Sequence, residues 1–172
     1  MSDSDKVTNQ QSLDKKQSNA VKTKTKTKPK LSLAKRRKAR RLILQALYQW
    51  LIAKADPLDI LKEFREENGG KIDWEYFQEV FIEIPKQVEI LDAHLQPLLD
   101  RDASALDPIE QALLYLGTFE LASRIDVPYK VVINECIDIA KEFGATDSHK
   151  YINGVLDKLA LTLRALEHSK NR

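Results

Sequence analysis

Apolar residues recur at helical spacing along most of this 172-residue chain. The first segment with this spacing covers residues 32–54, with Ser32 as its expected cap and with an apolar face formed by Ile43, Ala46, Leu47 and Trp50. Later segments repeat the period. No stretch shows a convincing strand pattern, because the β-branched residues 131–133 also lie within a helical period. The pattern therefore predicts an all-α domain of about six or seven helices.

Proline, glycine and short polar residues mark where the next helices should begin and end. We expect Asp56 to cap the second helix, with Pro57 at its first position. Asn68-Gly69-Gly70 should end that helix, and Asp73 should cap the third. Pro85 should kink the third helix or restart it, because proline lacks an amide donor.

Asp107-Pro108-Ile109-Glu110 is the strongest local signal. It combines a capping carboxylate, a proline at the first helical position and a glutamate at the third, as in a capping box. Pro128 should open another helix, with Gly144 as its C-terminal cap. One of residues 146–148 should cap the last helix, whose apolar face should continue to Leu166.

Charge is divided unevenly along the chain. Residues 1–41 hold 14 Lys/Arg and 3 Asp/Glu, whereas residues 42–172 hold 14 Lys/Arg and 23 Asp/Glu. Residues 1–31 offer no apolar face to bury and predict a disordered Lys/Thr-rich tail, followed by a helical domain over residues 32–168. The basic arm should attract a polyanion, and the acidic body suits a basic protein partner.

We expect a soluble, cytoplasmic protein that is not an enzyme and holds no cofactor. Cys136 is the only cysteine, and no apolar run approaches the ~18–20 residues that span a bilayer. The sequence has no phosphate-binding loop and no metal-ligand spacing. Asp147, Ser148 and His149 cannot form a hydrolytic triad, because neighbours on a helix point about 100° apart. A Cys136–His149 dyad is the one catalytic alternative left open.

The chemistry that the sequence supports is recognition of a nucleic acid. Residues 35–41 contain six cations and lead into a helix that carries Gln45 and Tyr48, while Lys150 and Tyr151 begin the last helix. Tyrosine rings can stack on unpaired bases while cations bind phosphates. The alternatives are that both tyrosines are core-boundary residues with hydrated hydroxyls, and that the basic run only solubilises the chain.

Several short motifs follow one another in one unbroken order: Asp126-Val-Pro-Tyr-Lys130, Ile133-Asn-Glu135, Ala140-Lys141, Phe143-Gly-Ala145, Asp147-Ser-His-Lys150 and Asn153-Gly-Val-Leu-Asp-Lys158. The first predicted helix adds Arg40, Gln45, Ala46-Leu-Tyr48 and Trp50. Together these motifs closely resemble the bacterial NusB family of transcription antitermination factors, from about Ala34 to about Arg164. We expect the Asn153-Gly154 pair to serve close helix packing.

The resemblance implies an all-α fold of about seven helices in two packed bundles. It also implies a non-catalytic protein that binds the boxA element of nascent ribosomal RNA as a single strand, together with the ribosomal protein NusE. That complex would join the elongating RNA polymerase and other Nus factors and suppress premature termination.

The resemblance assigns roles to individual residues as well. RNA contacts are expected from Arg36, Arg37, Lys38, Arg40, Gln45, Tyr48, Lys150 and Tyr151. Glu110 corresponds to a carboxylate in the NusE-binding region. Asp147 corresponds to the edge of the RNA surface, where a carboxylate should restrain affinity by repulsion. Tyr115 stands where a basic residue is expected, so we expect no phosphate contact there.

Two other interpretations stay open at this point. One is a helical protein–protein adaptor with a non-specific basic arm. The other is a NusB-like domain of the kind fused to RNA cytosine methyltransferases, although this chain has no room for a catalytic module. The sequence does not decide between a monomer and a homodimer.

Overall fold

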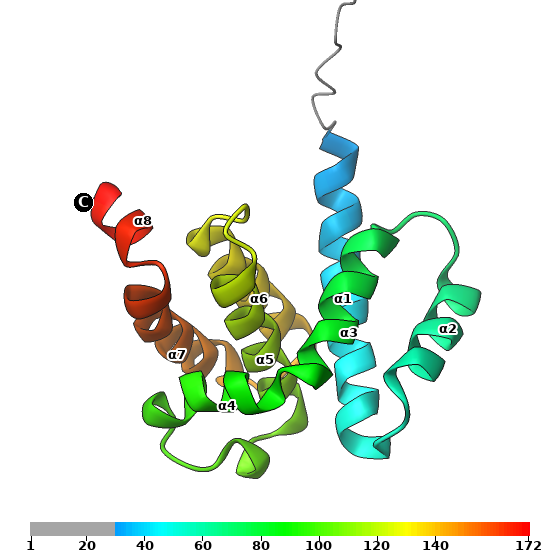
Figure 1. Cartoon of the computed structure of the whole chain (residues 1–172), viewed down its shortest axis with the longest axis horizontal. Helices are drawn as coiled ribbons and strands as arrows, with labels where there is room; N and C mark the ends of the chain where they lie inside the picture. Colours follow the sequence, from blue (N-terminus) through cyan, green and yellow to red (C-terminus); the bar gives the residue numbers. More distant parts are fainter. Residues whose placement is uncertain (1–29) are drawn as a thin grey trace, which may run out of the picture.

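The computed structural model describes residues 30–172, with side chains from residue 33 onward. This part of the chain forms eight α-helices and two short 3₁₀ helices, and it contains no strand (Figure 1). The α-helices are α1 (Lys30–Ala53), α2 (Pro57–Asn68), α3 (Trp74–Lys86), α4 (Val88–Leu95), α5 (Pro108–Ser123), α6 (Tyr129–Phe143), α7 (Ser148–Leu163) and α8 (Ala165–Lys170). The 3₁₀ helices η1 (Gln96–Leu98) and η2 (Ala103–Ala105) lie between α4 and α5. The predicted tail over residues 1–31 falls almost entirely outside the described residues.

The helices form two groups that share α5. Helices α1, α2 and α3 pack against one another, and α4 to α7 form the second group (Figure 1). Helix α5 contacts α1 and α3 of the first group and α4, α6 and α7 of the second. The prediction of an all-α fold in two packed bundles is therefore confirmed.

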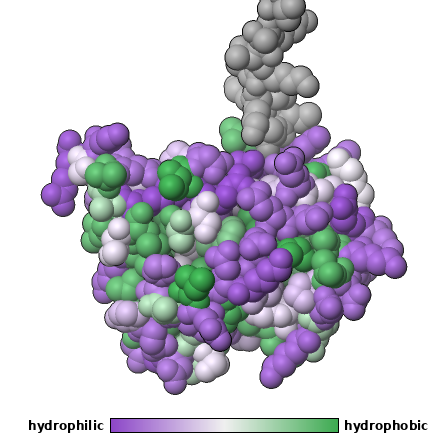
Figure 2. All heavy atoms as spheres, in the orientation of Figure 1, coloured by the Kyte–Doolittle hydropathy of each residue, from purple (hydrophilic) through white to green (hydrophobic). Residues whose placement is uncertain are grey.

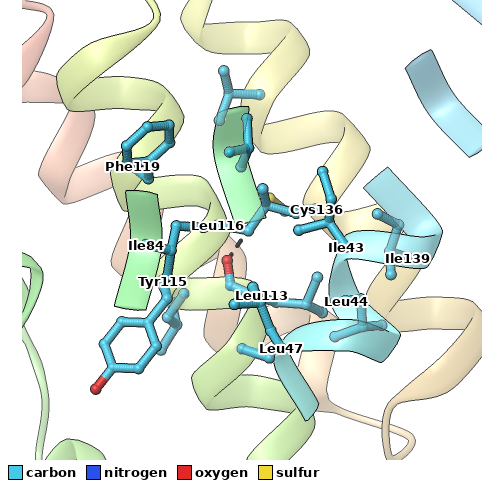
Figure 3. Packing of buried hydrophobic residues seen from close by; sticks show 14 of the residues in the cluster. Ile43, Leu44, Leu47, Ile84, Leu113, Tyr115, Leu116, Phe119, Cys136 and Ile139 are labelled. Atoms are coloured by element: carbon cyan, nitrogen blue, oxygen red, sulfur yellow. Dashed lines mark hydrogen bonds between the residues drawn. The ribbon is translucent and has the colours of Figure 1, made fainter. Parts of the chain in front are cut away.

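Apolar side chains from both groups meet around α5. Ile43 and Leu47 of α1 face Leu113 and Leu116 of α5, and all four are fully buried (Figure 3). Figure 3 also shows Cys136 among these side chains, with its Sγ 3.9 Å from the carbonyl oxygen of Leu113. On the outside, hydrophilic atoms cover most of the visible face and separate several small apolar patches (Figure 2).

Three predicted helix starts are confirmed by their capping hydrogen bonds. The carboxylates of Asp56 and Asp107 accept from backbone amides two residues later, at 2.8 and 2.9 Å. Asp73 accepts from the amide of Tyr76 at 3.1 Å. Each bond satisfies one of the amide groups that the first helical turn leaves without a partner. These starts depend on local chemistry, which is why the sequence predicts them well.

Other predicted boundaries need correction. Helix α1 begins at Lys30, so Ser32 lies inside the helix and is not its cap. Helix α3 continues through Pro85 to Lys86, and the restart comes at Gln87. Glu110 does not complete a capping box, because its carboxylate accepts a hydrogen bond from the hydroxyl of Ser148 at 2.8 Å.

The predicted last helix is interrupted at Arg164, and the prediction that Leu166 lies on its apolar face is wrong. Arg164 leaves helical geometry at φ −125° and ψ 36°, so Leu166 lies on α8 and is 82% exposed. The guanidinium of Arg164 is buried and donates hydrogen bonds of 2.7–3.1 Å to four backbone carbonyls, those of Glu120, Leu121, Arg124 and Val127. We call this arrangement the Arg164 clamp. It provides hydrogen bonds to the carbonyls of Leu121 and Val127, whereas those of Glu120 and Arg124 also accept from the backbone amides of Arg124 and Val127, both at 3.0 Å.

Close helix packing is found at Gly117 and not at Gly154. A Cβ added to Gly117 would lie 2.7 Å from Leu156 Cδ1, so the buried Leu156 side chain would have to move to accommodate a larger residue. A Cβ added to Gly154 would meet nothing within 4 Å. The expectation that Gly154 serves helix packing is therefore wrong.

Candidate nucleic-acid interface

The arginines of α1 lie beside acidic residues of α6. Arg37 forms ion pairs with Glu135 and Asp138 at 3.1 and 3.2 Å. Arg41 pairs with Glu142 at 2.7 Å. Arg37 remains half-exposed, as does Asp138. We call the solvent-accessible cations at the start of α1 the basic row. The structure gives two of them, Arg37 and Arg41, acidic partners that the sequence pattern did not indicate.

Arg36 and Arg40 turn toward the first helical group. Arg36 pairs with Asp73 at 3.4 Å, and its guanidinium lies 4.8 Å from the centre of the Tyr76 ring. Arg40 is only 3% exposed and holds the fully buried carboxylate of Glu120 through Nε and Nη2, at 3.0–3.3 Å. Arg40 is therefore not available as a surface contact, which corrects the expectation that it binds RNA.

Tyr76 completes a buried group with Arg40 and Glu120. Its hydroxyl donates to Glu120 Oε1, and its ring lies 5.2 Å from the Arg40 guanidinium carbon. Burial, followed by the neighbouring Glu120 carboxylate, raises the pKa of Tyr76. Burial alone would lower the pKa of Arg40, but the charge of Glu120, its hydrogen bond and smaller contributions from Tyr76 and Glu135 together raise it. The group therefore keeps both charges inside the core as a hydrogen-bonded ion pair.

Sequence reasoning did not identify Glu120, although one signal was present. Glu120 follows Leu113 and Leu116 on the apolar period of α5 and interrupts a nearly continuous apolar run. A carboxylate at such a position requires a buried cation or donor. Its partner Arg40 lies 80 residues away, within a run that reads as an exposed basic cluster.

Gln45 and Tyr48 are on the surface, as predicted. Both line a groove of about 570 Å³ between α1 and α2. The apolar side chains of Leu44, Phe64, Ile109 and Phe143 also line this groove, and Glu63 and Glu67 add two carboxylates from α2. Tyr48 is 43% exposed, so part of its ring is accessible to a stacking partner. Lys38 is exposed on the same helix.

Lys150 and Tyr151 lie in the first turn of α7. Lys150 is exposed and lies 3.4 Å from the carboxylate of Asp147. The hydroxyl of Tyr151 donates to Asp100 at 3.2 Å. Burial and the charge of Asp100 raise the pKa of Tyr151, while Arg101 lowers the pKa of Asp100 to about 2. Tyr151 therefore stays protonated, with its ring half-buried and its hydroxyl held in place.

The groove between α1 and α2 is linked to the start of α7 by a short stretch of chain and by one hydrogen bond. Phe143 lines the groove and ends α6, and α7 begins five residues later at Ser148. The Ser148 hydroxyl bonds to Glu110, which follows the groove residue Ile109. We call the Glu110–Ser148 contact the junction between α5 and α7. The groove side of this junction holds Gln45 and Tyr48, and the α7 side holds Asp147, Lys150 and Tyr151. The groove and the start of α7 are therefore neighbours through Phe143 and the Glu110–Ser148 contact.

Tyr115 points its hydroxyl away from the α5 core cluster (Figure 3). That hydroxyl donates to Asp92 at 2.7 Å and accepts from Gln111 at 3.2 Å. Burial, and then the hydrogen bond to Asp92, raises the pKa of Tyr115. The residue therefore stays neutral and supplies no cation to a phosphate.

The described residues give no support to a Cys136 nucleophile. Cys136 is fully enclosed in the core, and burial raises the pKa of its thiol. Reactive cysteines need the opposite environment, one that favours the thiolate. From residue 30 onward, no group of three or more His, Cys, Asp or Glu side chains could hold a metal ion. None of the helices in that range is long and apolar enough to cross a bilayer.

Comparison with known proteins gives matches over most of the chain. A sequence model of the NusB family matches residues 37–161. The transcription antitermination protein NusB of Hahella chejuensis is 50% identical over 137 residues, which cover 79% of this chain and 92% of that protein. The NusB of Alcanivorax borkumensis is 54% identical over 138 residues, which cover 80% of this chain and 92% of that protein.

Solved structures share the fold. The NusB of T. maritima superimposes with a TM-score of 0.71 at 28% sequence identity, over 77% of this chain and 96% of that chain. A second neighbour is a crystal structure of the antitermination factors NusB and NusE in complex with dsRNA. It has a TM-score of 0.66 and 25% identity, over 72% of this chain and 93% of that chain.

Proposed function

This chain belongs to the NusB family, and from that premise we propose that it is a transcription antitermination factor that binds RNA together with NusE. It acts without catalysis, in the cytoplasm, as part of the RNA polymerase elongation complex with other Nus factors. The observation that carries the proposal is the exposed pair Gln45 and Tyr48, which continues the basic row of α1 and meets the start of α7. Cations for phosphates and a ring for a base thus lie on one surface.

The RNA is a single strand that carries the boxA element. Unpaired bases expose their faces and edges, so they can stack on Tyr48 and hydrogen-bond to Gln45. A duplex hides both and would offer mainly its phosphates and ribose hydroxyls. The solved relative with NusE was crystallised with dsRNA, which supports RNA as the ligand class and makes a duplex the necessary comparison.

NusE is the protein partner, and Glu110 is our candidate contact for it. Its carboxylate is half-buried at the start of α5 and bonded to Ser148 at the start of α7. Lys150 and Tyr151 contact RNA beside it, with Asp147 at the edge of the RNA surface. The lysine-rich residues 1–31 add attraction for phosphates that strengthens binding without regard to sequence.

The test is fluorescence anisotropy of a labelled boxA strand at near-physiological salt. A scrambled strand and a boxA duplex serve as comparisons, each with and without NusE. We expect boxA to bind more tightly than both comparisons and NusE to increase that preference. Equal, salt-labile binding to all three RNAs, unchanged by NusE, would favour the adaptor with a non-specific arm.

Tyr48→Asp provides the residue-level arm of this test. Removing a base–aromatic stack costs about 1–3 kcal/mol, so we expect boxA affinity to fall by roughly 5- to 160-fold. The matched control is Leu58→Asp, which adds the same charge at an exposed apolar position of α2. Unchanged boxA affinity in Tyr48→Asp, with normal folding, would remove Tyr48 from the RNA surface.

A further inference from the structure

Three carboxylates of α6 lie against two arginines of α1. Glu135, Asp138 and Glu142 are spaced three and four residues apart, so they share one face of α6. They lie 3.1, 3.2 and 2.7 Å from guanidinium nitrogens of Arg37 or Arg41. We call these five side chains the arginine–carboxylate seam.

The outer part of the seam is open to solvent. Asp138 and Glu142 are close to half-exposed, and so is Arg37. Exposed ion pairs of this kind are weak and exchange their partners readily. A phosphate that approaches from solvent can therefore reach these arginines, but it must displace the carboxylates or lie beside them as a like charge.

We propose that Asp138 and Glu142 restrain RNA binding by competing with phosphates for Arg37 and Arg41. This inference rests on the proposed function and adds residues that limit affinity at the same site. Attraction between cations and phosphates supplies most sequence-independent binding. Because each carboxylate already pairs with an arginine, a phosphate that binds there only replaces one anion with another. Generic RNA then gains little, whereas boxA keeps its base contacts and its contact with NusE.

Asp138→Asn/Glu142→Gln is the variant that tests the seam. Both amides keep the size of the original side chain and its acceptor oxygen while removing the charge. Glu135 is left intact because its Oε2 is buried without a hydrogen-bond partner, so a substitution there would also alter packing. Thermal unfolding of the double variant should match that of the wild type, since exposed pairs contribute little to stability.

We expect the double variant to bind both boxA and the scrambled strand about 4- to 25-fold more tightly, at two- to five-fold per carboxylate. Its salt dependence should also become steeper, by up to about 1.4 in the slope of log K against log salt. The control is Glu66→Gln/Glu83→Gln, which removes two charges from exposed pairs on α2 and α3. The control should change affinity by less than about two-fold.

An NMR titration of the full chain with boxA gives an independent measurement. The Nε–H signals of Arg37 and Arg41 should shift, while that of the buried Arg40 should stay in place. Equal gains in the seam variant and the control would overturn the proposal, because net charge alone would explain them. So would no gain, or unmoved Arg37 and Arg41 signals. Failure of the wild type to bind boxA would instead overturn the proposed function.

Discussion

Arg37 and Arg40 show how one turn of a helix can hold two unrelated arginines. They are three residues apart, which places them about 60° apart around α1. Arg37 lies at the protein surface, where it pairs with Glu135 of α6, and Arg40 lies in the core with Glu120 and Tyr76. Composition and family resemblance describe both as members of one basic cluster. Only the tertiary contact with α5 separates a surface cation from a buried one, so the sequence could not assign Arg40 correctly.

Loss of the Glu120 charge should therefore destabilise the fold strongly. Glu120→Gln leaves Arg40 buried without its counter-charge, and we expect the free energy of unfolding to fall by about 3–5 kcal/mol. Urea denaturation measures this change. Glu79→Gln is the matched control, because Glu79 pairs with Arg124 at 2.8 Å but is half-exposed, and it should cost at most about 1 kcal/mol. Similar small losses in both variants would show that the buried pair does not need its charge.

At the scale of the element, two helical glycines have opposite roles. Gly117→Ala would place a methyl group 2.7 Å from Leu156, and we expect it to cost about 1–3 kcal/mol. Gly154→Ala meets no neighbour within 4 Å and removes a weak helix former from the interior of α7. That substitution should stabilise the protein by about 0.5–1 kcal/mol.

Thermal or urea unfolding of the two alanine variants distinguishes these cases directly. A destabilised Gly154→Ala variant would indicate that this position serves a contact outside the described residues. Gly154 lies in a family motif and Gly117 does not, yet Gly117 has the packing role. A motif records that a residue type recurs, but it does not say which surface needs the small side chain.

Helix starts were predicted better than helix ends. The carboxylate of a capping aspartate binds amides two or three residues away, so the sequence contains the whole interaction at Asp56, Asp73 and Asp107. The break at Arg164 has a distant cause, because its guanidinium binds carbonyls 37 to 44 residues earlier. The prediction relied on the apolar period alone and therefore extended the last helix to Leu166.

At the scale of the whole molecule, the predicted contacts divide into two sets around the junction between α5 and α7. Tyr48 and Gln45 lie on the groove side, and Lys150 and Tyr151 lie on the α7 side. The sequence predicted these residue types, but it did not indicate that Ile109, Phe143 and the Glu110–Ser148 bond bring the two sets together. That arrangement depends on packing between segments far apart in the chain.

Glu110→Lys tests how partner and RNA binding divide on this surface. We expect NusE affinity to fall by about ten-fold or more, because the change reverses the charge at the proposed NusE contact. RNA binding without NusE should change by less than about three-fold. Separate titrations of NusE and boxA measure the two effects. Ser148→Ala is the control, because it removes the hydrogen bond to Glu110 and leaves the charge in place.

If Ser148→Ala weakens NusE binding as much as Glu110→Lys does, the orientation of the α7 start is what NusE needs. If Glu110→Lys weakens RNA more than NusE, Glu110 belongs to the RNA surface and the proposed partner contact is wrong.

The Arg164 clamp has a consequence for the order in which the molecule is made. Four carbonyls between Glu120 and Val127 accept hydrogen bonds from a side chain that follows Val127 by 37 residues. A ribosome that adds about 5–20 residues per second needs roughly two to seven seconds to make that stretch. During this interval the carbonyls of Leu121 and Val127 lack the guanidinium, and those of Glu120 and Arg124 have only their local amide partners, so the end of α5 cannot be buried in its final form. The turn between α5 and α6 thus becomes native only after α7 has left the ribosome, however early its own residues emerge.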